Sequence, residues 1–262
     1  MFENLESRRL MTTTLDDSGI LTIQGAEGDD DVMVWQPLPA VMRVEHNGAV
    51  AEFGAEQVKG ISIDLGDGDD QVILGRRKAN ATIHGGAGND SLSAGEGDDE
   101  IHGGAGDDYL FGRGGNDTLD GGDGTGDSDA DDMLGGDGID TVDYSNRTTP
   151  VRVGLGVNSN DGAPDERDNT RDDIEIAIGG AGNDELHSFG VTSVTLIGNG
   201  GDDLLIGSPE NDLLVGGAGH DELNGAGGFD SYLARDGEVD VVIFGTGLTQ
   251  LERDVEDDVR AE

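Results

Sequence analysis

Aspartates recur at a fixed spacing through much of the chain. Between residues 85 and 120, Asp90, Asp99, Asp108 and Asp117 follow one another at intervals of nine, each shortly after two or more glycines. Two carboxylates about 4 Å apart repel by about 4 kcal/mol at an effective dielectric constant of about 20. A positive ion held between them would offset this repulsion. The repetition therefore favours cation binding over acid–base catalysis.

The composition of the whole chain points the same way. With 57 Asp and Glu against 15 Lys and Arg, the formal charge is -42, which opposes a compact state unless positive ions are bound. Nucleic acid is disfavoured as a ligand, since its binding relies on Lys and Arg displacing counter-ions from phosphate. No stretch approaches the about 20 apolar residues of a membrane span. We expect neither nucleic-acid binding nor a membrane span.

No catalytic constellation is apparent. The chain has no Cys, which excludes disulfides, thiolate metal sites and a cysteine nucleophile. The motifs H-E-x-x-H, G-x-S-x-G and G-x-x-x-x-G-K do not occur, and no segment outside the repeats is long enough for a separate catalytic domain. We therefore expect no enzymatic activity.

A nine-residue unit underlies the spacing of the aspartates. Residues 85–93 read GGAGNDSLS and residues 103–111 read GGAGDDYLF. Thirteen units can be counted: two isolated ones at 25–33 and 65–73, six between 85 and 143, and five between 179 and 233. Each has Asp at its sixth position and an apolar or aromatic residue at its eighth. A disordered acidic tail, the alternative interpretation of such composition, needs no apolar residue at a fixed period.

These units resemble the G-G-x-G-x-D-x-U-x repeat of hemolysin-type (RTX) calcium-binding proteins, where U is a large apolar residue. The resemblance implies an all-β fold, a parallel β-roll or β-solenoid of glycine-rich turns and three-residue strands, with two units in each coil. Because side chains alternate along a strand, only the eighth residue of each unit would point inward. These residues are Val32, Val72, Leu92, Ile101, Leu110, Leu119, Met133, Val142, Leu186, Leu205, Leu214, Leu223 and Tyr232.

The resemblance also implies multiple Ca²⁺ ions between stacked turns. Calcium accepts six to eight oxygen ligands, backbone carbonyls included, whereas magnesium demands a tighter octahedron. The implied metal-binding residues are the aspartates Asp30, Asp70, Asp90, Asp99, Asp108, Asp117, Asp131, Asp140, Asp184, Asp203, Asp212, Asp221 and Asp230, and the glycines Gly86, Gly88, Gly95, Gly97, Gly104, Gly106, Gly115, Gly136, Gly138, Gly180, Gly182, Gly201, Gly217, Gly219 and Gly228. The implied ligand pairs are Asp90 with Asp108, Asp99 with Asp117, Asp203 with Asp221, and Asp212 with Asp230. Asp131 is expected near the same edge as Asp108, and an insertion leaves its pairing open.

Six segments organise the chain. They are an N-terminal export-like segment at 1–18, an irregular β-solenoid cap at 19–84, a first repeat array at 85–143, an interrupting loop and strand segment at 144–178, a second array at 179–233, and a C-terminal strand with a charged tail at 234–262. The tail is expected to form a short helix or to fray. Outward strand positions become apolar in the second array, at 204–206 and 213–215, and an exposed apolar face of this kind needs cover. We expect that cover from strands at 151–153, 174–176 or 239–244, with another molecule as the alternative.

The first residues carry a further resemblance. The run from Leu5 to Met11 is similar to the L-E-P-R-x-L-L motif of large exported or surface proteins of planctomycete-like bacteria, with Ser7 in place of the proline and Met11 in place of the last leucine. The resemblance implies a secreted or cell-surface location. A flexible charged tail is the alternative.

Two smaller patterns remain. Asp127, Asp129 and Asp131 have the D-x-D-x-D spacing that opens an EF-hand loop, but Asp132 and Gly138 stand where Gly and a bidentate Glu are required, so that only an extra surface calcium site is possible there. The histidines at 84, 102 and 187 are expected to face outward, which could suggest a zinc site. We expect them instead to be separate surface residues in contact with solvent.

Three functions follow from these patterns. The first is an extracellular module that folds when calcium binds. The second is a calcium-dependent self-assembling or adhesive component of the cell surface or matrix, which would involve self-association or a surface partner. The third and least favoured is the calcium-folded tail of an RTX enzyme.

Overall fold

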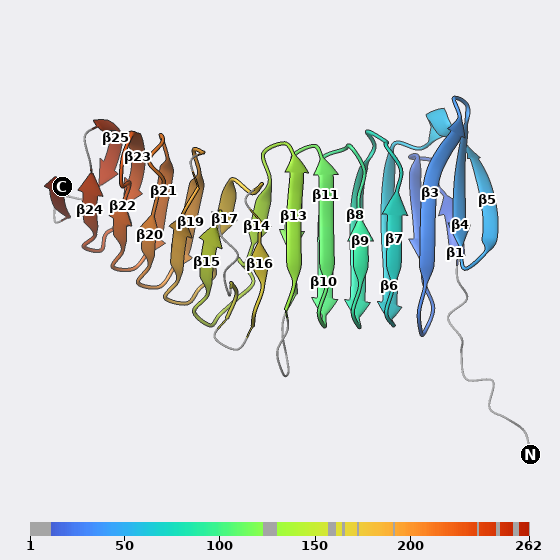
Figure 1. Cartoon of the computed structure of the whole chain (residues 1–262), viewed down its shortest axis with the longest axis horizontal. Helices are drawn as coiled ribbons and strands as arrows, with labels where there is room; N and C mark the ends of the chain where they lie inside the picture. Colours follow the sequence, from blue (N-terminus) through green and yellow to red (C-terminus); the bar gives the residue numbers. More distant parts are fainter. Residues whose placement is uncertain are drawn as a thin grey trace, which may run out of the picture. The chain divides into compact units, whose positions relative to one another are not determined.

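A computed structural model describes residues 12–122, 130–156, 161–163, 166–171, 173–190, 192–234, 236–244, 247–253 and 257–261. The N-terminal motif and two of the EF-hand-like aspartates, Asp127 and Asp129, lie outside the described residues. The chain forms two compact units: unit 1 holds residues 1–126 and 135–138, and unit 2 holds 127–134 and 139–262. Both are built of stacked strands (Figure 1). Among the described residues, the one helical turn is η1 (Ala55–Gln57), and no helix is long and apolar enough to cross a membrane.

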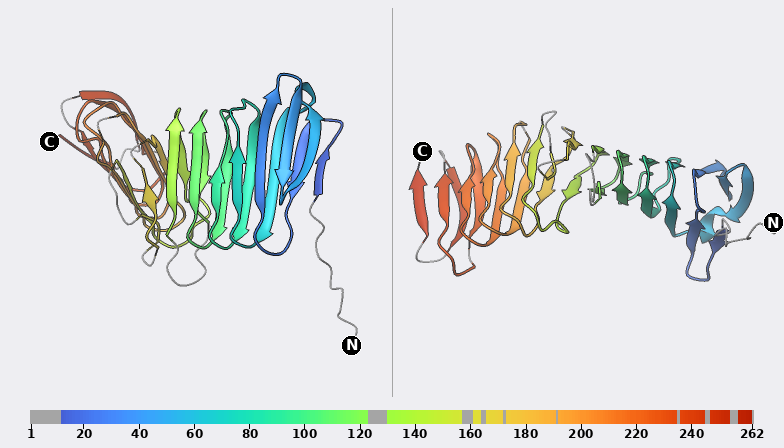
Figure 2. Two further views of the ribbon diagram at one scale, coloured as in Figure 1. Left: turned by 45° about the vertical axis from the view of Figure 1, so that its right-hand side comes forward. Right: turned by 90° about the horizontal axis from the view of Figure 1, so that it is seen from below.

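Unit 1 begins with an irregular cap. Strand β1 (Thr12–Leu15) pairs antiparallel with β2 (Ile20–Gln24), and β3 (Asp31–Leu38), β4 (Val41–His46) and β5 (Ala49–Gly54) form an antiparallel meander. Figure 2 shows this meander from two further sides. Buried and less buried residues alternate along β4, as expected of a strand with one face on the core. An irregular β cap is thus present at the N-terminal end, as predicted, but it ends before β6 (Gly60–Asp67), so the predicted range of 19–84 is too long.

The remaining strands of unit 1 are parallel and belong to two sheets. They are β6 (Gly60–Asp67), β8 (Asn80–Ala87), β10 (Glu100–Ala105) and β12 (Thr118–Asp120) in the sheet that starts with β1 and β2, and β7 (Gln71–Leu74), β9 (Ser91–Ser93) and β11 (Tyr109–Gly114) beside β3. Ile101 lies between Ile83 and Leu119, each eighteen residues away. One coil of the array therefore contains two nine-residue units, as predicted.

Unit 2 continues the same design. One sheet contains β14 (Thr141–Asp143), β17 (Ile176–Ile178), β19 (Thr195–Gly200), β21 (Leu213–Ala218), β23 (Phe229–Ala234) and β25 (Gly247–Arg253) in that order. The other contains β15 (Arg152–Leu155), β18 (Glu185–Ser188), β20 (Leu204–Ile206), β22 (Glu222–Asn224), β24 (Val241–Phe244) and β26 (Asp258–Ala261). In addition, β13 (Asp132–Asp137) pairs with β16 (Asn169–Thr170) through Asp132 and Met133. All of these pairings are parallel, which confirms the β-solenoid.

The core is a thin seam between the sheets. All thirteen eighth-position side chains are fully buried, with 0% of their surface exposed. A chain with 34% hydrophobic residues can fill a core this narrow, because one apolar residue in nine suffices. The predicted inward set is confirmed.

Two expectations for the flanking segments are wrong. Strands β15, β17 and β24 do not lie over an apolar face, because each is hydrogen-bonded within a sheet, to β18, β19 and β22 respectively. The C-terminal residues form strands β25 and β26, which pair with β23 and β24, and not a short helix or a frayed tail. The open edge of a sheet presents unpaired backbone N–H and C=O groups, and strands β25 and β26 satisfy them.

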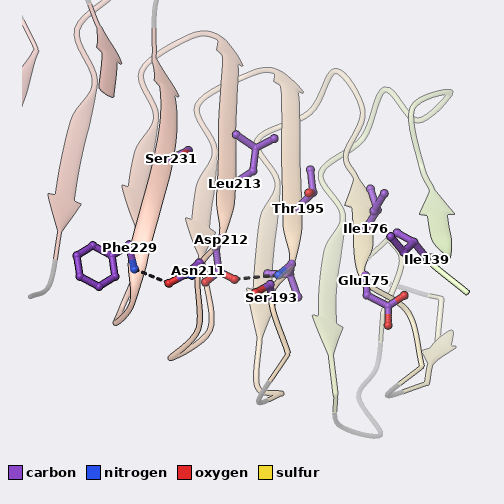
Figure 3. Close-up of a pocket in the computed structure, with 11 residues that line it drawn as sticks. Ile139, Glu175, Ile176, Ser193, Thr195, Asn211, Asp212, Leu213, Phe229 and Ser231 are labelled. Atoms are coloured by element: carbon purple, nitrogen blue, oxygen red, sulfur yellow. Dashed lines mark hydrogen bonds between the residues drawn. The ribbon is translucent and has the colours of Figure 1, made fainter. Parts of the chain in front are cut away.

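The outward face of the β17–β19–β21–β23 sheet consequently remains partly exposed. A shallow groove of about 440 Å³ runs along it, and Figure 3 shows the residues that line this groove. Its floor is the outward row Ile176, Thr195, Leu213 and Ser231, which are neighbours in register. Phe229, at the rim, is 64% exposed. The apolar outward positions predicted at 204–206 and 213–215 lie in two different sheets, on β20 and β21, and the described segments leave the groove on the β21 side open.

Candidate metal centres in the turns

The turns stack so closely that only glycine fits at certain positions. Gly86 and Gly104 both have positive φ, 122° and 121°, a conformation that costs glycine little. A Cβ on Gly104 would collide with the carbonyl oxygen of Gly86, one coil earlier. The carbonyl groups of one turn therefore face the next turn directly. The repeated glycines place backbone oxygens in the gaps between coils.

The glycines named from the sequence fall into two groups. Positive φ occurs at Gly86, Gly88, Gly104, Gly106, Gly115, Gly136, Gly138, Gly201, Gly217, Gly219 and Gly228, and does not occur at Gly95, Gly97, Gly180 and Gly182. The turns of the second group therefore have a different backbone path.

The sixth-position aspartates form columns, each residue one coil from the next. The backbone amide of Asp90 donates a hydrogen bond to Oδ1 of Asp108 at 2.7 Å. The same bond joins Asp30 to Asp70, Asp70 to Asp90, Asp99 to Asp117, Asp184 to Asp203, Asp203 to Asp221, and Asp212 to Asp230. The structure thus brings together all four pairs named from the sequence. Each bond fixes one carboxylate oxygen and so orients the other.

Among the described residues, the second oxygen of several column aspartates has no hydrogen-bond donor. Oδ2 of Asp70, Asp90, Asp203, Asp221 and Asp240 is buried and accepts no hydrogen bond from the described residues. Leaving a buried polar atom unsatisfied costs about 1–3 kcal/mol, and more when the group is charged. Buried polar groups in folded proteins are almost always paired. These five oxygens are therefore positioned for a ligand that carries positive charge.

The electrostatics of the columns support the same conclusion. Burial, helped by nearby carboxylates and opposed by one backbone hydrogen bond, raises the pKa of Asp90 and Asp203 to about 7. Burial likewise raises the pKa of Asp70, Asp221 and Asp240 to about 6. The ionised form of each carboxylate is thus disfavoured by its protein surroundings alone. A bound cation would reverse this penalty.

At Asp90 and Asp203 a glycine of the same turn leaves room beside the second oxygen. A Cβ on Gly198 would overlap both Oδ2 of Asp203 and the carbonyl oxygen of Gly216 in the next coil. A carboxylate oxygen and a carbonyl oxygen from two coils therefore converge where glycine leaves room. Hard oxygen donors of mixed type are the ligands that calcium prefers. The residues present fit Ca²⁺.

Carboxylates of other units are satisfied by their own turns. Oδ2 of Asp99 accepts the amide of Gly95 at 2.9 Å, and Oδ2 of Asp184 accepts that of Gly180 at 2.7 Å. Oδ2 of Asp30 accepts the amide of Ala26 at 2.8 Å. The predicted ligand set is thus not uniform, and the sequence repeat alone did not distinguish these units.

Two predicted positions have neighbours that the repeat does not contain. The backbone amide of Asp131, whose pairing the sequence left open, donates to Oδ1 of Asp168 at 3.1 Å. The backbone amide of Asp140 donates to Oε2 of Glu175 at 3.0 Å. Asp168 and Glu175, from the interrupting segment, therefore accept the backbone hydrogen bonds that column aspartates accept elsewhere.

Sequence reasoning also missed the C-terminal continuation of a column. The amide of Asp221 donates to Oδ1 of Asp240 at 2.9 Å, and that of Asp240 donates to Oδ1 of Asp257 at 3.2 Å. No pair of glycines precedes Asp240, so the repeat pattern does not identify it. The available signal was an Asp two residues before an inward residue, here the fully buried Val242.

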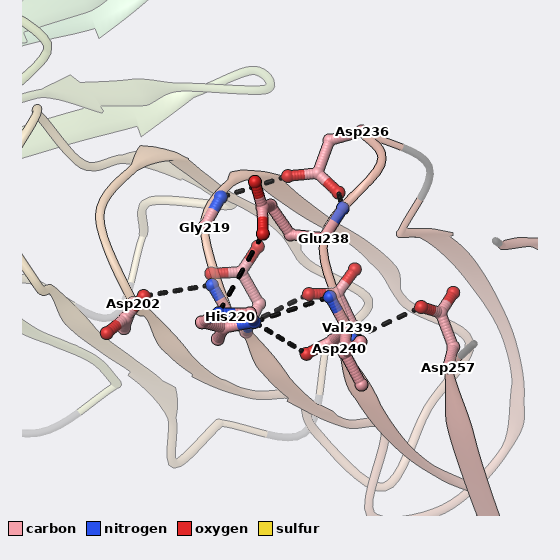
Figure 4. A network of polar contacts seen from close by, with 9 residues as sticks. Asp202, Gly219, His220, Asp236, Glu238, Val239, Asp240 and Asp257 are labelled. Atoms are coloured by element: carbon pink, nitrogen blue, oxygen red, sulfur yellow. Dashed lines mark hydrogen bonds and ion pairs between the residues drawn. The ribbon is translucent and has the colours of Figure 1, made fainter.

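The fifth-position side chains form a second column. They accept hydrogen bonds from backbone amides of the following coil, whereas the sixth-position side chains accept them from the preceding coil. Oδ1 of Asp202 accepts the backbone amide of His220, which is in the next coil, at 2.9 Å (Figure 4). Oδ1 of Asp98 likewise accepts the amide of Asn116, one coil later, at 2.9 Å. The fifth-position side chains thus bond the later coil, while the sixth-position ones bond the earlier coil. This leaves the sixth-position Oδ2 atoms as the inner oxygens of the turn.

Side chains alone do not form a closed metal cage. Among the described residues, no three His, Cys, Asp or Glu side chains group closely enough to hold a metal ion. The donors in a gap are stacked carboxylates together with backbone carbonyls. Such a site suits calcium, which accepts carbonyl oxygens in irregular geometry.

Comparison with known proteins agrees with this geometry. The chain matches the family model of the RTX calcium-binding nonapeptide repeat in four copies, at residues 79–110, 93–125, 170–190 and 197–232. The matches together cover less than half of the chain, two in unit 1 and two in unit 2. A search of curated proteins found no match. The stacked turns in the matched segments are thus similar to RTX calcium-binding repeats.

Proposed function

We propose that this protein is an extracellular calcium-binding β-roll whose folding is driven by Ca²⁺ bound between stacked Gly/Asp turns. One observation carries the proposal: column aspartates such as Asp90, Asp203 and Asp221 bury a carboxylate oxygen that accepts no hydrogen bond from the described residues. The match to calcium-binding repeats supports it.

Different groups of each turn would have different roles in binding Ca²⁺. Oδ2 of the sixth-position aspartates and the carbonyl groups of the turn glycines would hold the ion, as beside Asp203, Gly198 and Gly216. When bound, calcium supplies positive charge between carboxylates that otherwise repel. Oδ1, held by an amide of the neighbouring coil, orients the carboxylate. The inward aliphatic residues exclude water from one side of the turn.

Calcium binding would make stability depend on compartment. A ligand that binds only the folded state stabilises it by about 2.7 kcal/mol per site when its concentration is about 100 times its Kd. Several sites add their contributions, against a formal charge of -42 that opposes compaction. Low cytoplasmic calcium would leave the chain unfolded and competent for export, and extracellular calcium would fold it. The proposal includes no catalytic activity.

Circular dichroism of the full chain tests this function. In chelator the β-strand signal is expected to be weak or absent, and it should appear cooperatively as calcium is added, but not with magnesium. Asp203→Asn with Asp221→Asn should move the calcium midpoint to a higher concentration. Glu210→Asn, which removes an exposed charge outside the columns, should not. A strand signal that is unchanged by chelation would falsify the proposal.

A second function is favoured by the uncovered face of unit 2. The outward row Ile178, Ile197, Val215 and Leu233 is uncharged, half-buried and continuous in register, two residues along the same strands from the row that lines the groove. Such a face suits calcium-dependent self-assembly or adhesion. Light scattering with and without calcium tests this: particle mass should rise with calcium in the native chain and should not rise in Ile197→Asp with Val215→Asp. An unchanged mass in the native chain excludes self-assembly.

A further inference from the structure

We propose that unit 1 carries a second kind of metal site, in which His84 and His102, flanked by Asp64 and Asp120, bind a borderline divalent ion such as Zn²⁺. This site lies on the outward face of a sheet, away from the turns, and is chemically distinct from the proposed calcium sites.

The four side chains form one row across four consecutive strands. Asp64 on β6 is in register with His84 on β8, His84 with His102 on β10, and His102 with Asp120 on β12. Neighbouring strands are about 4.8 Å apart, and residues in one register row project from the same face. The row therefore reads carboxylate, imidazole, imidazole, carboxylate at a constant spacing.

The two imidazoles are not the isolated surface residues that the sequence suggested. Their ring centroids are 4.6 Å apart and their planes differ by 11°. They are eighteen residues apart, which is the length of one coil, so they are neighbours on adjacent strands. The side chain of His102 is 27% exposed. The pair is thus ordered by packing and still accessible from solvent.

Carboxylates contact both ring nitrogens of His102. Nδ1 lies 3.3 Å from Oδ2 of Asp120, and Nε2 lies 3.1 Å from Oε1 of Glu100. In metal sites a carboxylate at one ring nitrogen fixes the tautomer and makes the other nitrogen a better ligand. The arrangement around His102 provides that partner on either side.

Ligand type selects the metal. Imidazole nitrogen suits zinc, copper and nickel, whereas calcium prefers hard oxygen donors. Zinc takes nitrogen and carboxylate ligands at about 2.0–2.2 Å. No three such side chains already converge among the described residues, so binding turns the rings of His84 and His102 out of their stack. The ion then takes the place of the contact between His102 and Asp120.

A structural stack without metal is the competing explanation, and unit 2 offers a matched control. His187 on β18 holds the same ninth strand position, but its register neighbours are Gly154 and Ile206. It has neither a second imidazole nor a carboxylate in its row. A histidine at this strand position that merely faces solvent should behave like His187.

Zinc titration of the full chain in saturating calcium tests the proposal, with excess calcium occupying the carboxylate turns. The readouts are calorimetry and the side-chain ¹⁵N signals of the histidines. The expected result is one high-affinity Zn²⁺ per chain, with ring signals of His84 and His102 shifting together. His84→Gln and His102→Gln should each weaken binding at least tenfold, while His187→Gln should not.

The proposal is overturned if the ring signals of His84 and His102 in the native chain do not move with zinc. It is equally overturned if His187→Gln weakens binding as much as the other two variants do. Circular dichroism in calcium verifies that each variant is folded. Because that signal depends on the turns, failure of the calcium function and failure of the zinc site give different results.

Discussion

The hydroxyl of Tyr144 donates a hydrogen bond to Oδ2 of Asp168 at 2.9 Å, deep inside unit 2. Oδ1 of Asp168 accepts the amide of Asp131, as a column aspartate does. At Asp203 and Asp221 the corresponding Oδ2 atom accepts no hydrogen bond from the described residues. A phenol thus supplies at Asp168 the contact that a cation would supply elsewhere, so we expect the stability of this coil not to depend on calcium.

Tyr144→Phe should destabilise unit 2 by about 1–3 kcal/mol, because it leaves a buried carboxylate oxygen without its donor. The loss should be the same at low and high calcium concentrations, in contrast to Asp203→Asn, whose effect should change with calcium. Thermal unfolding followed by circular dichroism measures both. Tyr109→Phe, at a site that is 39% exposed, is the control and should have little effect. A calcium-dependent loss in Tyr144→Phe would contradict the assignment.

Two adjacent glycines in one turn should differ sharply in tolerance. At Gly115, φ is 123° and a Cβ would collide with the carbonyl oxygen of Gly97, whereas a Cβ on Gly114 would meet nothing closer than 3.7 Å. Gly115→Ala should therefore lower stability by more than about 1 kcal/mol and weaken calcium binding. Gly114→Ala should be neutral or stabilise by about 0.4–1 kcal/mol, because alanine restricts the unfolded chain. Equal midpoints of thermal unfolding would show that the turns do not pack as described.

The calcium column should extend past the last recognisable repeat. Asp240→Asn removes a negative charge whose Oδ2 is buried without a donor among the described residues, so the number of bound calcium ions should fall by one. Asp258→Asn, at an exposed residue paired with Arg260, should leave the number unchanged. Calorimetric stoichiometry at a fixed protein concentration distinguishes the two. Identical stoichiometry in both variants would end the column at Asp221.

The sequence predicts features that depend on residues close together in the chain better than features that depend on residues far apart. The inward residues and the eighteen-residue coil were predictable because the nine-residue period is repeated locally, and a residue such as Leu110 needs no partner to be recognised. Asp168 and Asp240 were not predicted to belong to the columns, because no glycine pair precedes either residue. Their positions depend on hydrogen bonds from the backbone amides of Asp131 and Asp221.

The histidines show the opposite case, in which the signal was present and not used. A separation of eighteen residues equals one coil, so His84 and His102 had to be neighbours once the solenoid was accepted. The strands that join the sheets at 152–155 and 258–261 were harder to foresee. These strands are stabilised by backbone hydrogen bonds to the open edge of a sheet. They can be predicted only when the neighbouring strand is known.

The response to pH is the sharpest consequence of the buried columns. Burial raises the pKa of Asp90 and Asp203 to about 7 from an ordinary value of 3.8, so without calcium the folded state binds more protons than the unfolded state. Its stability is therefore greatest below about pH 4 and falls as pH rises towards about 7. In chelator, strand signal should be stronger at pH 5 than at pH 8.

Calcium must reverse this trend, because it binds only the deprotonated carboxylates and releases their protons. Affinity should rise from pH 5 to pH 8, and calorimetry in two buffers of different ionisation enthalpy should show net proton release on binding. Asp90→Asn together with Asp203→Asn removes two of the raised groups and should reduce that release, whereas Asp16→Asn, at an exposed residue whose pKa is lowered by its hydrogen bonds with Ser18 and Ile20, should not. Calcium affinity that is flat across this range would mean that the column carboxylates are already ionised before the metal arrives.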